Sequence, residues 1–259
     1  MTDLDLILQA AKAAGELALN ARAGGLKIWS KDGGSPVTDA DLAVDTLLKT
    51  ELQAARPDYG WLSEETADDP ARLTTTRQFV VDPIDGTVAF MKGKPWFAVS
   101  IAVVENGQPV AGVVHAPALN ETYAATADGP ATLNGVIIEP SATQALEGAA
   151  MLGDAKMFRH PAWREPWPDM RIESRNSIAY RVCLVAAGAF DAAVALSAKS
   201  EWDVAAADLI RRRAGAWLSD HQGRDYAYNR PIPQVPSLVC ANQALAPLIL
   251  SRVGHIELP

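Results

Sequence analysis

The hexapeptide DPIDGT at residues 82–87 is the feature that most constrains what this chain can form. It directly follows the apolar residues 79–81, which are typical of a short buried strand. Its two aspartates, three residues apart around a proline turn, can converge on one cation, and Mg²⁺ prefers such oxygen ligands. Gly86 lets a ligand approach the backbone, and free amides after the turn can bind phosphate oxygens. Thr87 adds a hydroxyl that can orient a water molecule, so the segment indicates a site for a hard cation and a phosphate.

Three further acidic segments, at residues 39–41, 64–65 and 201–203, can contribute to the same site. Each also has a structural explanation. Asp41 can favour a helix N-terminus by its charge, and Asp203 can be a helix N-cap. The pair at 64–65 can be a solvated loop. Taken one at a time, these alternatives stay open.

Hydrophobic periodicity predicts two helices and then a largely antiparallel sheet, followed by alternating helices and strands from about residue 141. The dipeptide Asn106-Gly107 predicts a tight hairpin turn. We therefore expect an N-terminal half, residues 1–140, and a C-terminal half, residues 141–259, packed as one unit. The expected helices cover residues 4–24, 39–56, 177–187, 203–214 and 242–250, and the expected strands cover 79–81, 97–105, 110–115, 121–125, 192–196 and 238–240.

Composition excludes several classes of protein. The chain has 31 acidic and 23 basic residues, a formal net charge of −8, which argues against a nucleic-acid polymer as partner. Its apolar runs fall short of the roughly 18 residues of a membrane helix, so we expect no membrane span, and we expect no signal peptide. Two cysteines, Cys183 and Cys240, form neither a disulfide framework nor a zinc cluster, which predicts a reducing, cytoplasmic location.

Four motifs together resemble the inositol monophosphatase family of Mg²⁺-dependent, lithium-sensitive phosphatases. They are PVTDAD at 36–41, SEE at 63–65, DPIDGT at 82–87 and WDVAA at 202–206, in family order and at family-like spacing. The resemblance covers nearly the whole chain. It implies an α/β (α+β) fold, a layered αβαβα sandwich of the inositol monophosphatase and fructose-1,6-bisphosphatase type. It also implies an active site between the two halves and a possible homodimer.

The resemblance further implies that two to three Mg²⁺ ions bind. Glu64, Asp82 and the main-chain carbonyl of Ile84 would hold the first ion. Asp82, Asp85 and Asp203 would hold the second, and a third, weaker ion would lie near Glu64 through waters.

Catalytic roles follow from the same resemblance. Glu64 and Thr87 would orient or deprotonate the attacking water, and Asp41 would hydrogen-bond to Thr87. The backbone amides of Gly86 and Thr87 would bind the substrate phosphate. Residues 31–35 resemble the family's mobile lid.

The substrate is expected to be a small phosphorylated metabolite. Several details resemble the bacterial 3′(2′),5′-bisphosphate nucleotidase (CysQ-like) branch, in which Arg181 would pair with a second phosphate. Ser177, ahead of the same predicted helix, is a further expected substrate contact, together with Asp85 and Asp203. Residues 194–197 lack the acidic residue that binds inositol hydroxyls in the animal enzymes. These observations favour adenosine 3′,5′-bisphosphate as substrate.

Other departures keep alternatives open. After Thr87 the chain has Val88-Ala89 where nucleotidases favour Lys-Glu, and residues 198–201 replace the usual Gly-Pro-Thr lead-in. Inositol 1-phosphate, fructose 1,6-bisphosphate and histidinol phosphate are therefore alternative substrates. A non-catalytic relative that binds phosphorylated ligands is a remote alternative, because the whole predicted ligand set is present. The aromatic-rich loop at 159–168 can stack an adenine or form an oligomer contact. We expect all four histidines to be structural.

Overall fold

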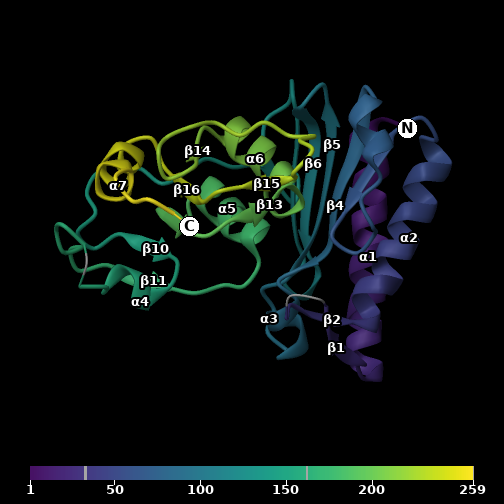
Figure 1. Ribbon diagram of the computed structural model, residues 1–259, viewed down its shortest axis with the longest axis horizontal. Coiled ribbons are helices and arrows are strands. Elements are labelled where there is room, and N and C mark those ends of the chain that lie inside the picture. The colour runs from purple at the N-terminus through teal and green to yellow at the C-terminus, as the bar shows by residue number, and fades with distance from the viewer. Residues whose placement is uncertain (32–33, 162, 259) are drawn as a thin grey trace.

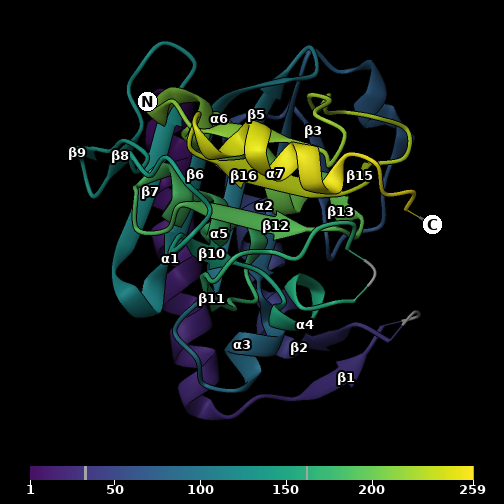
Figure 2. The same ribbon diagram turned by 90° about the vertical axis from the view of Figure 1, so that its left-hand side faces the viewer.

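Five layers of secondary structure, in the order αβαβα, make up the protein (Figure 1). The computed structural model describes residues 1–31, 34–161 and 163–258. Helices α1 (Asp3–Gly24) and α2 (Asp39–Ala55) cover one face of a seven-stranded sheet, and α5 (Ile178–Ala186) and α6 (Glu201–Ala214) separate it from a five-stranded sheet. Helix α7 (Leu245–Val253) lies across the outer face of the smaller sheet (Figure 2). The sandwich predicted from the sequence is confirmed.

The larger sheet has the strand order β3-β4-β5-β6-β7-β8-β9, in which only the β3–β4 pair is parallel. Asn106 and Gly107 both have positive φ and close the β5–β6 hairpin, as the sequence predicts. Its strands are β3 (Gly60–Ser63), β4 (Arg77–Asp85), β5 (Ala98–Glu105), β6 (Gln108–Ala116), β7 (Glu121–Thr126), β8 (Thr132–Leu133) and β9 (Val136–Ile137).

The smaller sheet has the order β11-β10-β12-β16-β14 and mixes parallel and antiparallel pairs. The chain passes into it after the larger sheet is complete, and α6 then returns to pack on the larger sheet. Its strands are β10 (Ala150–Leu152), β11 (Arg171–Glu173), β12 (Ala192–Ala195), β14 (Trp217–Ser219) and β16 (Leu238–Ala241). The short elements are β1 (Ile28–Ser30), β2 (Pro36–Thr38), η1 (Pro70–Thr74), α3 (Thr87–Met91), η2 (Pro117–Leu119), α4 (Ala155–Phe158), β13 (Lys199–Ser200) and β15 (Gln234–Val235).

No helix in the described part of the chain has the length and apolarity needed to cross a membrane. Cys183 and Cys240 are both free and buried in the core, so neither is positioned as a surface thiol.

Helix α6 packs closely on the larger sheet at Gly112 of β6. A Cβ atom at this position would lie 2.8 Å from the carbonyl oxygen and 3.1 Å from the Cα of Ala206. At the start of the same helix, the hydroxyl of Ser100 on β5 donates to the carbonyl of Trp202 at 3.2 Å. These contacts fix where the first turn of α6 meets the sheet.

We expect Gly112→Ala to lower the free energy of unfolding by about 1–3 kcal/mol, because the opposing atoms are backbone and cannot rotate away. Urea denaturation measures the change. Gly24→Ala is the matched control, because nothing lies within 4 Å of a Cβ there and its φ needs no glycine. An unchanged urea midpoint in the Gly112 variant would show that α6 and β6 have room for a methyl group at this contact.

Candidate active site

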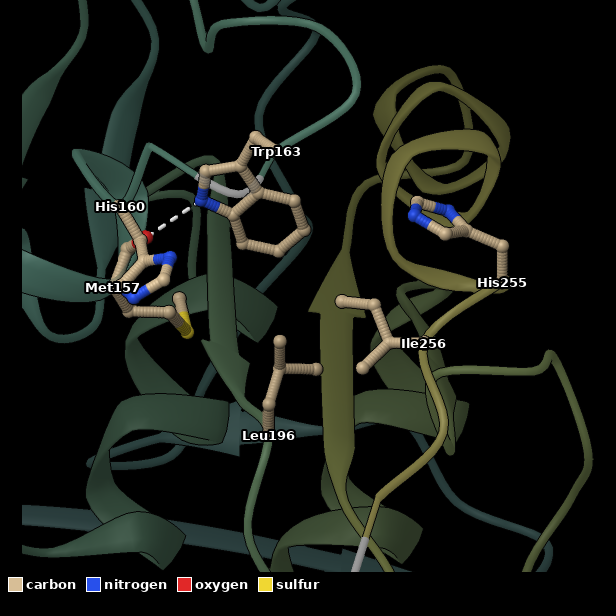
Figure 3. Close-up of a pocket in the computed structure, with 6 residues that line it drawn as sticks. All are labelled: Met157, His160, Trp163, Leu196, His255 and Ile256. Carbon is tan, nitrogen blue, oxygen red and sulfur yellow. Dashed lines mark hydrogen bonds between the residues drawn. The ribbon is translucent and has the colours of Figure 1, made fainter.

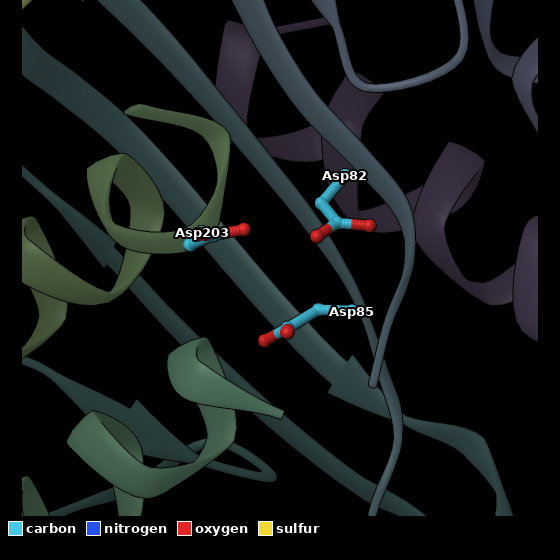
Figure 4. Close-up of side chains that lie close together, drawn as sticks. All are labelled: Asp82, Asp85 and Asp203. Atoms are coloured by element: carbon cyan, nitrogen blue, oxygen red, sulfur yellow. The ribbon is translucent and has the colours of Figure 1, made fainter. Parts of the chain in front are cut away.

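Asp82 and Asp85 lie at the end of β4, where a bulge interrupts pairing with β5. Asp82 pairs with Ser100 and Asp85 with Ala98, so β4 carries one more residue than its partner over this stretch. Residues three apart in a regular strand point to opposite faces. The extra residue changes that alternation, and both carboxylates turn to the same side. Figure 4 shows them converging with Asp203.

Asp203 reaches the site from the first turn of α6. Ser200 is the N-cap of this helix, and Asp203 accepts a hydrogen bond from its N–H at 2.8 Å. Asp203 is therefore the third helical residue of a capping box, and the alternative that it is itself the N-cap is wrong. The helix also begins at Glu201, two residues earlier than the sequence pattern suggests.

The three aspartates form a compact cluster that can hold a metal ion. One carboxylate oxygen from each lies within 4.8 Å of the others, with Asp82 and Asp85 buried and Asp203 half-buried. Burial raises the pKa of Asp85 to about 6, although hydrogen bonds oppose the shift. Burial, and then the charge of Asp85, raises the pKa of Asp203 to about 8. Burial and neighbouring carboxylates hold the pKa of Asp82 well above its ordinary value.

The hydrogen bonds that reach this cluster come from neutral groups, so they do not compensate its negative charge. Asp82 accepts from the N–H of Ile84 at 3.1 Å, and Asp203 accepts from the N–H of Ser200. A buried, all-oxygen, anionic donor set fits a hard divalent cation such as Mg²⁺.

Asp85 is held by the N-terminus of α5. The hydroxyl of Ser177, the N-cap of that helix, donates to it at 2.6 Å. The N–H groups of Ile178 and Ala179 donate to it at 3.1 and 2.7 Å. Gly86 permits this approach, because its φ is 93° and a Cβ there would lie 2.9 Å from the nitrogen of Ser177.

Ser177 thus has a role that the sequence did not suggest. It is fully buried, and its hydroxyl also accepts from the N–H of Tyr180 at 3.0 Å. The structure shows it as a residue that positions Asp85, while its expected contact with substrate stays a prediction.

Glu64 lies beside the cluster because of the parallel pairing of β3 with β4. Ser63 pairs with Val81, so the next residues are Glu64 and Asp82, and the N–H of Glu64 donates to the carbonyl of Val81 at 3.3 Å. The Glu64 carboxylate forms an ion pair with Lys31 at 2.9 Å, and Lys31 also pairs with Glu65 at 2.7 Å.

Sequence reasoning missed this role of Lys31, which it treated only as part of a lid. The strands β1 and β2 flank the predicted lid, and the N–H of Lys31 donates to the carbonyl of Ser35 at 2.8 Å. Residues 32 and 33 of the predicted lid lie outside the described residues, so its mobility stays a prediction.

Thr87 follows Gly86 as the first residue of α3, with its hydroxyl 3.2 Å from both Asp41 and the carbonyl of Ile84. The expected Thr87–Asp41 hydrogen bond is therefore present. The other carboxylate oxygen of Asp41 caps α2 by accepting from the N–H and the hydroxyl of Thr38 at 2.8 and 2.6 Å. Asp41 thus serves both the helix terminus and Thr87, and the two interpretations made from the sequence are compatible.

Two basic side chains near the cluster line a cavity of about 490 Å³ that begins at the N-terminus of α5. Arg181 on α5 and Lys199 on β13 both line it. Burial lowers the pKa of both side chains. The negative charge of Asp85 opposes this shift at Arg181, and the negative charge of Asp203 is the main group that opposes it at Lys199. Arg181 was expected from the sequence. Lys199 was missed, although it lies in the segment that departs from the family lead-in, which was the available signal.

The sequence model of the inositol monophosphatase family matches residues 2–257. The chain belongs to the inositol monophosphatase family. It is 32% identical to a histidinol-phosphatase of Chlorobaculum parvum, covering 98% of both chains. It is 31% identical to the 3′(2′),5′-bisphosphate nucleotidase CysQ of Escherichia coli K12, covering 87% of this chain and 93% of that relative. Among solved structures, the IMPase of Thermotoga maritima matches with a TM-score of 0.85 at 28% identity, covering 98% and 97% of the two chains.

As a member of the inositol monophosphatase family, this chain is a phosphatase that acts on small phosphorylated substrates. The family depends on metal, in agreement with the carboxylate cluster. The relatives carry three different substrate names, so membership alone does not select the substrate.

Outside the cluster, two arginines of α6 are paired within their own helix, and two of the four histidines are buried and hydrogen-bonded. Arg211 and Arg212 in the last turn of α6 form ion pairs with Asp208. His115 and His221 are buried and hydrogen-bonded, to the hydroxyls of Thr122 at 2.9 Å and Ser237 at 2.7 Å respectively. The other two histidines, His160 and His255, line a separate cavity.

The raised pKa values predict how this enzyme responds to pH. A divalent cation must displace protons from Asp85, with a pKa of about 6, and Asp203, with a pKa of about 8. We therefore expect the Kd for Mg²⁺ to fall as pH rises from 6 to 8, by up to about tenfold per unit for each proton displaced. Titration calorimetry at pH 6, 7 and 8 measures it.

The same raised pKa values determine how the stability of the metal-free protein changes with pH. The folded protein keeps protons on these carboxylates that the unfolded chain, with an ordinary pKa near 3.8, has already lost. Metal-free stability is therefore fully present below about pH 3.8 and falls as pH rises from there, up to about 6 for Asp85 and about 8 for Asp203. A metal-free Tm that rises across this window would contradict the cluster's assigned pKa values.

Proposed function

We propose that this enzyme is a Mg²⁺-dependent phosphomonoesterase that removes the 3′-phosphate from a 3′(2′),5′-bisphosphate nucleotide, with adenosine 3′,5′-bisphosphate as the best candidate. The observation that carries the proposal is the pair Arg181 and Lys199 in the cavity beside the carboxylate cluster. A nucleoside bisphosphate has a second phosphate that two basic side chains can bind. The other phosphate then lies toward the aspartates.

The metal-binding part of the proposal rests on the oxygen donors described above. Glu64, Asp82, the carbonyl of Ile84, Asp85 and Asp203 would hold two to three Mg²⁺ ions. When bound, such ions neutralise the phosphate, stabilise the leaving oxygen and lower the pKa of a coordinated water.

The remaining roles belong to side chains and amides of the chain itself. Thr87 and Glu64 orient the water that attacks phosphorus. The Thr87 hydroxyl accepts a hydrogen bond from that water and donates its own proton to Asp41, which fixes its direction. The N–H groups of Gly86 and Thr87, at the start of α3, bind the phosphate oxygens.

Charge is the argument against two alternative substrates. Histidinol phosphate carries an ammonium group close to its phosphate ester, and Arg181 and Lys199 repel that cation. Inositol 1-phosphate has no second anion to pair with them. Fructose 1,6-bisphosphate has one and stays in the comparison. The near full-length match to a histidinol-phosphatase makes histidinol phosphate the second candidate.

Three further properties are part of the proposal because the family resemblance or the composition suggests them. They are inhibition by Li⁺, a homodimer and a cytoplasmic location. The acidic composition and the free, buried cysteines support the last of these.

Phosphate release with Mg²⁺ from the four candidate substrates tests the proposal. We expect kcat/KM to be at least about tenfold higher for adenosine 3′,5′-bisphosphate, because each charge-assisted contact to the second phosphate is worth about 1.5–3 kcal/mol. Arg181→Met and Lys199→Met should each remove most of that preference. Lys156→Met, an exposed lysine beside the cavity, is the matched control. A preference for histidinol phosphate or inositol 1-phosphate would overturn the substrate assignment.

A further inference from the structure

A second cavity, of about 380 Å³, adjoins the one that contains Arg181 and Lys199. Met157 and Leu196 line both cavities, so the two spaces lie next to each other at these side chains. The remaining walls of the second cavity are His160, Trp163, His255 and Ile256. The cavity that contains the two basic side chains therefore has a largely apolar neighbour.

Trp163 is held rigidly in the wall of this second cavity. Its indole N–H donates to the carbonyl of Met157 at 2.6 Å. Its ring meets Trp167 edge to face at 5.5 Å, and Trp167 meets Phe158 in the same way at 5.0 Å. The guanidinium of Arg252 lies over the ring of Trp167 at 5.4 Å. A ring fixed in this way loses little conformational entropy when a ligand packs on it.

The opposite wall is aliphatic. In Figure 3, Trp163 lies on one side of the cavity and Leu196 and Ile256 lie on the other, with His160 and His255 at its two ends. The indole is seen nearly face on in this view, so the edge of its ring is turned toward these aliphatic side chains. The space between them is bounded by apolar groups, which suits a flat, largely apolar ring. We call this space, lined by the six residues named above, the aromatic slot.

We propose that the aromatic slot binds the heteroaromatic base of the substrate's nucleoside, while the second phosphate contacts Arg181 and Lys199. The inference rests on the proposed function and assigns its base-recognition site. Ser174 and Asn176, which line the polar cavity, face the ribose between the two ends. An inositol or sugar phosphate carries only hydroxyls and anions, and would leave the apolar walls without a partner.

The experiment compares two substrates that differ only in the base. They are adenosine 3′,5′-bisphosphate and the base-free analogue methyl riboside 3,5-bisphosphate, each assayed with Mg²⁺. We expect Trp163→Ala to raise KM for the nucleotide by about tenfold, the loss typical of one stacked base, with kcat little changed. KM for the base-free analogue should stay the same, and Trp163→Phe should restore most of the nucleotide affinity.

Two further variants keep the test clear of folding effects. Ile256→Ser, on the opposite wall, should shift KM in the same direction, and Leu248→Ala, an exposed side chain of α7 outside the slot, should not. If Trp163→Ala changes both substrates equally, or neither, the slot does not bind the base. If Trp163→Ala changes the sedimentation coefficient of the protein and neither KM value, the loop at 159–168 forms an oligomer contact, and the proposal is overturned.

Binding without turnover separates this inference from the proposed function. Adenosine 5′-monophosphate should bind the wild-type protein more tightly than ribose 5-phosphate, and Trp163→Ala should abolish the difference. Equal binding of both probes by the wild type overturns the slot assignment even if the nucleotide is hydrolysed. If adenosine 5′-monophosphate binds as expected but no substrate releases phosphate, the slot stands and the proposed activity fails.

Discussion

Replacing Asp82 with asparagine is expected to abolish phosphate release and, at the same time, to make the metal-free protein more stable. Asp82 is fully buried among like charges, and its pKa is raised well above the ordinary value by burial, then by Glu64 and Asp85. The amide keeps the oxygen that accepts from the N–H of Ile84 and removes the repelled charge. The same change removes a carboxylate that would bridge two metal ions.

We expect kcat/KM of Asp82→Asn to fall by at least about a thousandfold, since a metal contributes several kcal/mol to the barrier. The metal-free Tm should rise by about 2–4 °C for each kcal/mol of repulsion removed in a chain of this size. Activity assays and thermal melts in EDTA measure the two effects. Asp128→Asn, an exposed aspartate outside the cluster, should change neither. Loss of both activity and stability would mean that Asp82 is needed by the fold rather than by the metal.

Replacing Thr87 with valine is expected to lower kcat by about a hundredfold or more and to leave KM nearly unchanged. Valine has the shape of threonine without the hydroxyl, so the backbone of α3 and the amides at its start keep their places. The hydroxyl lies 3.2 Å from Asp41 and 3.2 Å from the carbonyl of Ile84, which fixes its direction. A group that orients water or moves its proton contributes about 10²–10⁴ in rate.

Thr87→Ser is the matched control and should keep most of the activity, because it retains the hydroxyl. The kcat of Asp41→Asn should lie between those of the two Thr87 variants. Its amide oxygen still accepts from the Thr87 hydroxyl, but it caps α2 more weakly than the carboxylate does. Steady-state kinetics with the preferred substrate give both constants. A Thr87→Val variant with wild-type kcat would remove Thr87 from the catalytic role proposed for it.

The sequence predicted best what depends on neighbouring residues along the chain. The hexapeptide at 82–87 and the hairpin at Asn106-Gly107 carry strong local signals, and the structure bears out both the turn and the convergence of the aspartates. Strands β10, β11 and β14 were missed, because they are held by pairing with strands far along the chain, which no local pattern records.

Contacts between distant segments escaped the sequence for a different reason. The pairing of Lys31 with Glu64 joins residues 33 positions apart, and no local pattern records it. Lys199 lies on β13, which pairs with β15 about 35 positions further along the chain and directly precedes α6, so its place near Asp203 also leaves no local pattern. The position of Asp203 within its helix was also missed, because Ser200 and Asp203 are both acceptable N-cap residues.

The hydrogen bonds from α5 to Asp85 have a consequence for the order of events during synthesis. Asp85 and its partner Ser177 are separated by 92 positions, and Asp203 is made later still. A nascent chain that has released only its first half therefore carries two aspartates without the helix that orients one of them or the third carboxylate that completes the set. We expect such a chain to have little affinity for Mg²⁺, so that metal capture marks the moment when α5 and α6, the middle layer, have docked on the larger sheet.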